Sequence, residues 1–258
     1  MTLIIAIKCK DGLVFASDGQ ATSFSSGGPI RQKCKKIYQL GELLVGASGS
    51  LGTIQRCRDC VNEYAISISE YGLNHIIIEE FPDGKIRRIP IRDKIRQLIF
   101  EINKDELERH EAFYGKAEGA PLADILIGLF DKKAGKFRIW HVTPDGGEEL
   151  LDEIGYGCTG IGDVFAYPIL RDYYTPDLDA IKAMLVAYRV IKDAIEVGAY
   201  GLGEPIDIWI MKRNEENEKI EIHNLREEEV AALHDAYIMW KDMENKIFKE
   251  FMKEFERI

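Results

Sequence analysis

The strongest constraint on the fold is that extended segments occur in pairs joined by tight turns, both before and after the helical segments. The first pair spans residues 3–18, where two apolar, β-branched runs flank Lys10-Asp11-Gly12, a pattern typical of a β-hairpin. A second pair, residues 33–40 and 42–49, meets at Gly41-Glu42. Strands joined by such short turns run antiparallel, so the chain is predicted to form antiparallel sheets and not a βαβ alternation.

The remaining segments fit the same scheme. A loop is expected over residues 23–30, which are rich in Ser and Gly, and a helix from Gly52, where apolar residues recur at spacings of three and four. The later elements are predicted as an inserted hairpin at about 76–91, a helix at 91–115, a meander of three strands within 123–160, helices at 162–174 and 178–197, and strands at 204–213 and 219–224. The fold class is therefore α+β: two antiparallel sheets packed face to face with helices outside, a four-layer α/β/β/α sandwich.

The C-terminal segment from Arg226 is predicted to be one long helix, with Asn224 and Glu227 forming a capping box at its start. Its apolar residues form a heptad-like stripe interrupted by Glu244 and Glu254: Val230, Leu233, Tyr237, Trp240, Ile247, Phe251 and Ile258. This stripe packs on its own domain or contacts a partner, and binding to a membrane surface is a more remote third option on so acidic a chain. We therefore expect a main domain at 1–225 and a helical extension at 226–258.

Charge and apolar patterning exclude several function classes. The 258-residue chain has a net charge of −10, which argues against nucleic acid or an anionic membrane as the main partner. It has no apolar run long enough to span a bilayer and no secretory signal pattern, so a cytoplasmic protein is expected. The five cysteines form no disulfide framework or zinc-ligand spacing, and no metal site is predicted. For the Cys57–Cys60 pair a structural role is expected, with a redox role as the alternative.

Four residues in the first fifty could together perform nucleophilic catalysis. Once the initiator methionine is removed, Thr2 has both a hydroxyl nucleophile and an α-amine base, whose reference pKa is about 8. A lysine such as Lys36 would lower the pKa of that amine, and Asp18 could hold the lysine in place. N–H groups from the glycine-rich turn at 46–50, which begins with Gly46, could bind an oxyanion.

In their order along the chain, these residues resemble the proteasome β-subunit and HslV peptidase family of N-terminal nucleophile (Ntn) hydrolases. TLIIAIKCKDGLVFASDGQAT resembles the family's first hairpin, with SDGQAT closest to the HslV form; KCKKIYQL resembles its lysine-bearing strand and LLVGASGS its oxyanion strand. Further likeness lies in ILIGLFDKKAGKFRIWHVTPDGG, YGCTGIGDVFAYPILRDYY and EPIDIWIMKR. The resemblance spans roughly residues 2–225 and implies the Ntn-hydrolase type of sandwich.

The resemblance implies a threonine-type endopeptidase or amidase. Thr2 would attack a peptide carbonyl and form an acyl-enzyme that water hydrolyses, Asp18 would hold Lys36, and the Gly46 N–H would bind the oxyanion. The implied substrate-binding residues are the backbone groups of Thr22 and Ser48 and a side-chain pocket near Ala21, Cys34, Leu44 and Ser48. The resemblance also implies a peptide or protein substrate, a homo-oligomer, no cofactor, and an ATP-dependent unfoldase as a candidate partner.

The chain departs from the family's pattern at two places. Ile161 stands where the family's glycine-rich turn has a serine, so Thr159 or Asp163 would have to replace it. In the loop before residue 204, Glu196 and Tyr200 are the candidates for the family's acid and hydroxyl. Two alternatives stay open: a catalytically silent assembly subunit, which a retained initiator methionine would favour, and a transpeptidase that passes the acyl group to an amine.

Overall fold

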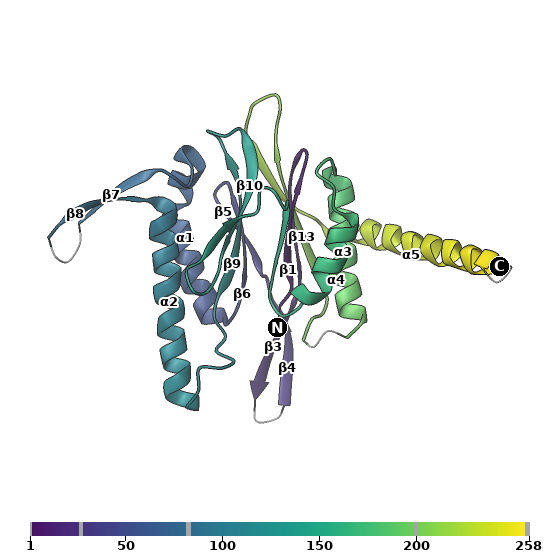
Figure 1. The fold of residues 1–258 in the computed structure, drawn as a ribbon, viewed down its shortest axis with the longest axis horizontal. Coiled ribbons are helices and arrows are strands. Elements are labelled where there is room, and N and C mark those ends of the chain that lie inside the picture. The colour runs from purple at the N-terminus through teal and green to yellow at the C-terminus, as the bar shows by residue number, and fades with distance from the viewer. Residues whose placement is uncertain (1, 26–27, 81–83, 199–200, 256–258) are drawn as a thin grey trace.

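The computed structural model describes residues 2–25, 28–80, 84–198 and 201–255, and these form a four-layer α/β/β/α sandwich (Figure 1). The first sheet has the strand order β12 (Tyr156–Thr159), β1 (Ile4–Cys9), β2 (Gly12–Asp18), β13 (Ile206–Arg213) and β14 (Ile220–Asn224). The second has the order β11 (Glu148–Leu150), β10 (Lys136–Val142), β9 (Asp124–Asp131), β6 (Leu43–Ser48) and β5 (Ile37–Leu40). All strand pairs in both sheets are antiparallel, so the predicted fold class is confirmed.

Helices cover both outer faces of the sandwich. The helices are α1 (Leu51–Tyr71), α2 (Ile91–Tyr114), α3 (Asp163–Tyr173), α4 (Ala180–Glu196) and α5 (Glu227–Phe255). Alternation along β1 supplies two apolar faces: Ile5 packs with α3 and α4, whereas Ile4 packs between the two sheets. Helices α1 and α2 cover the outer face of the second sheet (Figure 1).

The segment 148–159 is not one strand of a meander, as the sequence predicted. It contains two short strands in different sheets: β11 pairs with β10, and β12 pairs with β1. The break is a turn in which Gly155, with a φ of 79°, donates its N–H to the carbonyl of Leu151 at 2.8 Å. The chain thereby crosses from the second sheet to the first and places Thr159 opposite Ile4.

The predicted loop at 23–30 is also wrong, because most of it belongs to a hairpin of β3 (Gln20–Ser25) and β4 (Gly28–Lys33). This two-stranded ribbon lies outside both large sheets, so its strands need no alternation of apolar residues and their Ser and Gly content is typical of a loop. The inserted hairpin is confirmed as β7 (Ile76–Glu80) and β8 (Ile86–Pro90).

The start of α5 differs from the predicted capping box. The Arg226 N–H donates to Glu229 Oε2 at 2.8 Å, so Glu229 is the carboxylate that caps the helix. Asn224 instead donates through Nδ2 to Asp207 Oδ1 at 2.6 Å, within the first sheet.

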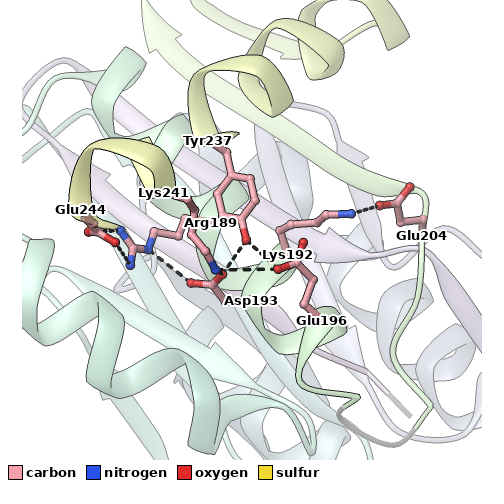
Figure 2. Close-up of polar contacts among 8 residues, drawn as sticks. All are labelled: Arg189, Lys192, Asp193, Glu196, Glu204, Tyr237, Lys241 and Glu244. Carbon is pink, nitrogen blue, oxygen red and sulfur yellow. Dashed lines mark hydrogen bonds and ion pairs between the residues drawn. The ribbon is translucent and has the colours of Figure 1, made fainter. Parts of the chain in front are cut away.

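The first half of α5 packs on its own domain. Tyr237 is 1% exposed, and Val230, Leu233 and Trp240 pack against the cluster that includes α3 and α4. Glu244, expected to interrupt the stripe, forms a two-pronged ion pair with Arg189 of α4, at 2.6 and 3.0 Å (Figure 2). One half of the stripe is therefore an intramolecular contact.

The second half of α5 projects away from the sandwich (Figure 1). Its large apolar side chains are exposed, including Ile247, Phe248, Phe251 and Phe255; Ile258 lies outside the described residues. None of the described helices is long and apolar enough to span a membrane.

Candidate active site

Asp18 is the centre of the site. It ends β2, is fully buried, and accepts hydrogen bonds at Oδ1 from Lys36 Nζ at 2.6 Å and from the Leu3 N–H at 2.9 Å. Its Oδ2 accepts from the N–H groups of Gln20 at 3.3 Å and Gly203 at 3.2 Å. The predicted pairing of Asp18 with Lys36 is thus present, and the same carboxylate also holds the backbone on both sides of it.

Lys36 is 5% exposed. Burial lowers the pKa of its ammonium, and the charge of Asp18 and the hydrogen bond to it oppose this shift without cancelling it. Its side chain therefore loses a proton more readily than that of an exposed lysine.

Thr2 lies two residues before the start of β1 and is 9% exposed. A glycine-rich turn holds its carbonyl: Gly162 donates its N–H to Thr2 O at 3.3 Å. Gly160, with a φ of 99°, lies so close that a Cβ there would collide with the same oxygen. Thr2 is thus fixed between the turn at 160–162 and the Asp18-bound N–H of Leu3. Met1 lies outside the described residues.

Gly46 does not offer a free N–H. It lies inside β6, opposite Ile37 of β5 on one side and Leu126 of β9 on the other. In an antiparallel sheet, the N–H of a residue with neighbours on both sides belongs to the ladder. A Cβ at this position would lie 2.7 Å from Ile4 Cγ2, so the glycine here allows the two sheets to approach each other.

Gly49 is the residue of the 46–50 turn whose N–H lies beyond the ladder. It follows the last residue of β6 and has a φ of 129°. The Ala47 N–H donates to the carbonyl of Lys36 at 3.3 Å, and N–H directions alternate along a strand. Continued by one residue past the end of β6, this alternation assigns the N–H of Gly49 to the side of Lys36. The sequence predicted an oxyanion donor within this turn and named Gly46, since the local pattern does not separate it from Gly49.

The predicted substrate-binding residues have different environments. Ala21 and Thr22 lie half-buried on β3, and half-buried Cys34 lines a hollow of about 530 Å³ with Gly19 and Pro205. Leu44 is fully buried between the two sheets, so its predicted place in an open pocket is wrong. The fifth residue, Ser48, is 7% exposed and ends β6.

The residues predicted to replace the family serine and acid lie in different surroundings. Ile161 is 58% exposed, whereas Thr159 is buried and bonded to Ser48 Oγ at 2.7 Å. Glu196 accepts a hydrogen bond from Tyr237 at 2.9 Å in the contact between α4 and α5 (Figure 2), so it belongs to that interface and not to the surroundings of Thr2. Tyr200 lies outside the described residues.

The Cys57–Cys60 pair lies on α1. Cys57 is fully buried, which raises the pKa of its thiol to about 12, and burial also raises the pKa of half-buried Cys60. Raised thiol pKa values disfavour the thiolate that redox chemistry needs. In the part of the chain that the structure describes, no three His, Cys, Asp or Glu side chains are grouped as metal ligands would be.

Comparison with known proteins relates the chain to proteasome subunits. The family model described as "Proteasome subunit" matches residues 108–211. A proteasome subunit beta of Archaeoglobus fulgidus is 29% identical over 209 residues, covering 80% of this chain and 83% of that protein. The corresponding subunit of Ferroglobus placidus is 27% identical over 210 residues, covering 80% and 84%.

Solved structures show the same fold. "Anbu (ancestral beta-subunit)" from Yersinia bercovieri superposes with a TM-score of 0.66 at 17% identity, and the match covers 96% of this chain and 97% of that one. An Anbu (Gly-1) mutant from Hyphomicrobium sp. strain MC1 gives a TM-score of 0.64 at 16% identity with the same coverage. The chain is thus similar to proteasome β subunits and has the fold of Ntn-type Anbu proteins. The closer likeness to HslV stays a prediction.

Proposed function

We propose that this chain is a threonine-type peptidase or amidase whose nucleophile is Thr2, exposed by removal of Met1. The observation that carries the proposal is the buried Asp18–Lys36 pair, because the same Asp18 oxygen binds both the lysine ammonium and the N–H of the residue after Thr2. Similarity to proteasome β subunits supports the same reaction class.

In the proposed reaction, Thr2 Oγ attacks a peptide carbonyl, and the Thr2 α-amine takes the hydroxyl proton. The positive charge of Lys36 lowers the pKa of that amine, so that a fraction of it is neutral near pH 7. The proton then passes to the leaving amine, and an ester remains on Thr2. Water attacks the ester in the second half, and its proton returns Thr2 to a free hydroxyl.

For the oxyanion we propose the N–H of Gly49 in place of that of Gly46. Gly46 belongs to the sheet ladder, whereas Gly49 follows the end of β6, and the alternation of N–H directions favours the side of Lys36 for its N–H. A preorganised backbone N–H of this kind stabilises the charge of a tetrahedral intermediate.

The substrate is proposed to lie as an extended strand between β3, at Ala21 and Thr22, and the Ser48-Gly49 segment. Cys34 and its neighbours in the hollow would then contact a substrate side chain. A homo-oligomer is proposed as well, supported by the exposed apolar side chains of the second half of α5, and an ATP-dependent unfoldase stays a candidate partner.

The test is the intact mass of the purified protein before and after treatment with a peptide epoxyketone, which reacts with both a threonine hydroxyl and its free amine. We expect loss of Met1 and one adduct per chain in the wild type and in Thr2→Ser, and no adduct in Thr2→Ala. Fully processed protein that forms no adduct would reject the proposal in favour of a silent assembly subunit. Adding a peptide amine to the acyl-enzyme separates the third option, since a ligated product would indicate a transpeptidase.

A further inference from the structure

Four polar side chains form a continuous hydrogen-bonded chain beside the site. Ser48 Oγ bonds Thr159 Oγ1 at 2.7 Å, Thr159 Oγ1 donates to Asp124 Oδ2 at 2.6 Å, and His141 Nε2 bonds Asp124 Oδ1 at 2.7 Å. Ser48 and Thr159 are 7% and 1% exposed, whereas Asp124 and His141 are partly exposed. We call these four residues the relay.

The chemistry of the groups fixes the direction of each bond. Thr159 has one hydroxyl proton and donates it to Asp124, so Ser48 must donate to Thr159. Asp124 accepts at both oxygens, which an ionised carboxylate does best, and His141 donates from Nε2. Burial lowers the pKa of His141, but the hydrogen bond and charge of Asp124, helped by the charge of Glu149, outweigh burial and raise it.

The relay crosses between the two sheets. Thr159 ends β12 in the first sheet, while Ser48, Asp124 and His141 lie on β6, β9 and β10 of the second. Opposite Thr159 on β1 stands Ile4, whose side chain packs between the sheets. Hydrogen bonds shielded from water are stronger than exposed ones, and the two bonds of buried Thr159 join the first sheet to the second at this end.

The residues that follow the relay belong to the site. Directly after Thr159 comes the turn at 160–162, in which Gly160 lies close against the Thr2 carbonyl and Gly162 donates its N–H to it. Directly after Ser48 comes Gly49, whose N–H is the proposed oxyanion donor. The hydrogen bond between Ser48 and Thr159 therefore joins the two turns on which the nucleophile and the oxyanion donor depend.

We propose that the relay is a positioning network that holds Thr2 at a fixed distance from the Gly49 N–H. Its four side chains act through the turns at 49 and 160–162. The proposal rests on the proposed function for its catalytic consequence, since misplacing reacting groups by about 1 Å can cost on the order of a hundredfold in rate.

The experiment compares Thr159→Val with Thr159→Ser. Valine keeps the shape and removes the hydroxyl, whereas serine restores it. Ser69→Ala is the matched control, because Ser69 is also a buried hydroxyl, bonded to the carbonyl of Ala65 within α1 at 2.9 Å. Two quantities are measured in each variant: the rate of epoxyketone labelling at Thr2, and amide hydrogen exchange at Ser50 and Gly162, whose N–H groups are bonded to the carbonyls of Pro121 and Thr2 in the two turns.

For Thr159→Val we expect the labelling rate at saturating epoxyketone to fall on the order of tenfold or more. The epoxyketone concentration that gives half of this rate should change little. Amide hydrogen exchange should become faster in both turns. Thr159→Ser and Ser69→Ala should stay close to the wild type in both measurements. If Thr159→Val fails to fold, Ser48→Ala, which removes only the first bond of the relay, takes its place. Because the Ser48-Gly49 segment also lies along the proposed substrate, only the maximal labelling rate and hydrogen exchange are compared in that variant.

Two results for Thr159→Val would overturn the positioning role of the relay: unchanged hydrogen exchange in both turns, or labelling of Thr2 at the wild-type rate. A wild type that is never labelled is a separate outcome, which rejects the proposed function. Hydrogen exchange then decides alone whether the relay positions the two turns.

Discussion

Two aspartates, each paired with a lysine, differ in their burial and in the groups that donate hydrogen bonds to them. Asp18 is fully buried and accepts three backbone N–H groups besides the Lys36 ammonium. Asp193 of α4 is 18% exposed and is bonded only through side chains in the described contacts: Tyr237 at 2.7 Å, Lys241 at 2.9 Å and Arg189 at 3.2 Å (Figure 2).

This difference shows which parts of the molecule each carboxylate holds together. The N–H groups on Asp18 belong to the starts of β1 and β3 and to the segment before β13, so this one side chain fixes three backbone segments around Thr2. Asp193 connects α4 to α5, outside the first sheet. Asp18 should therefore affect reactivity and folding together, whereas Asp193 should affect only the docking of α5.

Asp18→Asn is predicted to have the largest effect. The amide removes the negative charge that pairs with the buried Lys36 ammonium, and breaking one side of a buried pair costs about 3–5 kcal/mol in the free energy of unfolding. Thr2 should also be labelled on the order of a hundredfold or more slowly, because its neighbour Leu3 loses a charged acceptor. Urea unfolding and epoxyketone labelling measure the two quantities. Stability and labelling both close to the wild type would contradict the role given to Asp18.

Asp193→Asn is the matched change at the other aspartate. Burial raises the pKa of this carboxyl, but its bonds to Tyr237 and Lys241 outweigh burial and lower it. Losing the charge should cost about 1.5–3 kcal/mol of unfolding free energy, as expected for hydrogen bonds to an ionised group. The labelling rate of Thr2 should stay at the wild-type value. A rate that falls as far as in Asp18→Asn would abolish the contrast between the two aspartates.

Tyr237→Phe separates two contributions of Tyr237 beside Asp193: the packing of its ring and the hydrogen bonding of its hydroxyl. The ring is buried, and its hydroxyl lies 2.7 Å from Asp193 Oδ1 and 2.9 Å from Glu196 Oε2. Phenylalanine keeps the packing, and Asp193 keeps its two cations, so we expect a smaller loss of about 0.5–1.5 kcal/mol. Thermal unfolding measures it, with Tyr71→Phe on exposed Tyr71 as control. A loss larger than in Asp193→Asn would place the main contribution on the hydroxyl.

The same contrast explains which parts of the site could be predicted from the sequence. Thr2 and Lys36 stand just before strands and Asp18 ends one, and local patterns of apolar runs and turn residues mark these strands in the sequence. Their order along the chain is enough to place the three residues together. Gly46 and Gly49 occupy the same turn in the sequence. Only pairing with β9, far along the chain, decides which N–H is free, and no local pattern contains that information.

The contacts of α5 could not be predicted from local patterns either, because they depend on segments far apart in the sequence. Glu196 is an acid in the right stretch of chain, but docking of α5 brings Tyr237 to it and assigns it to the interface. At the start of α5 the residues Glu227, Glu228 and Glu229 are consecutive, so the spacing of a capping box fits more than one register. The bond from the Arg226 N–H selects Glu229.

Glu229→Gln is predicted to have the smallest effect on stability. It tests whether the contribution of Asp18 to the free energy of unfolding comes from its bonds to backbone N–H groups or from its burial. Like Asp18, Glu229 accepts a backbone N–H, from Arg226 at 2.8 Å, but its side chain is 36% exposed. The Arg226 N–H, His223 and the Arg226 side chain lower its pKa to about 2. Since the folded pKa lies below that of a free glutamate, its contribution is present above about pH 4.5 and is lost as the pH falls toward 2.

The midpoint of thermal unfolding of the wild type and Glu229→Gln should therefore differ slightly at pH 6 and converge as the pH is lowered toward 2. The difference at pH 6 should be smaller than that produced by Asp193→Asn, because solvent screens an exposed carboxylate. If Glu229→Gln instead destabilised the protein as much as Asp18→Asn, bonding to backbone N–H groups alone would account for the effect of Asp18. Burial would then not be the property that distinguishes it.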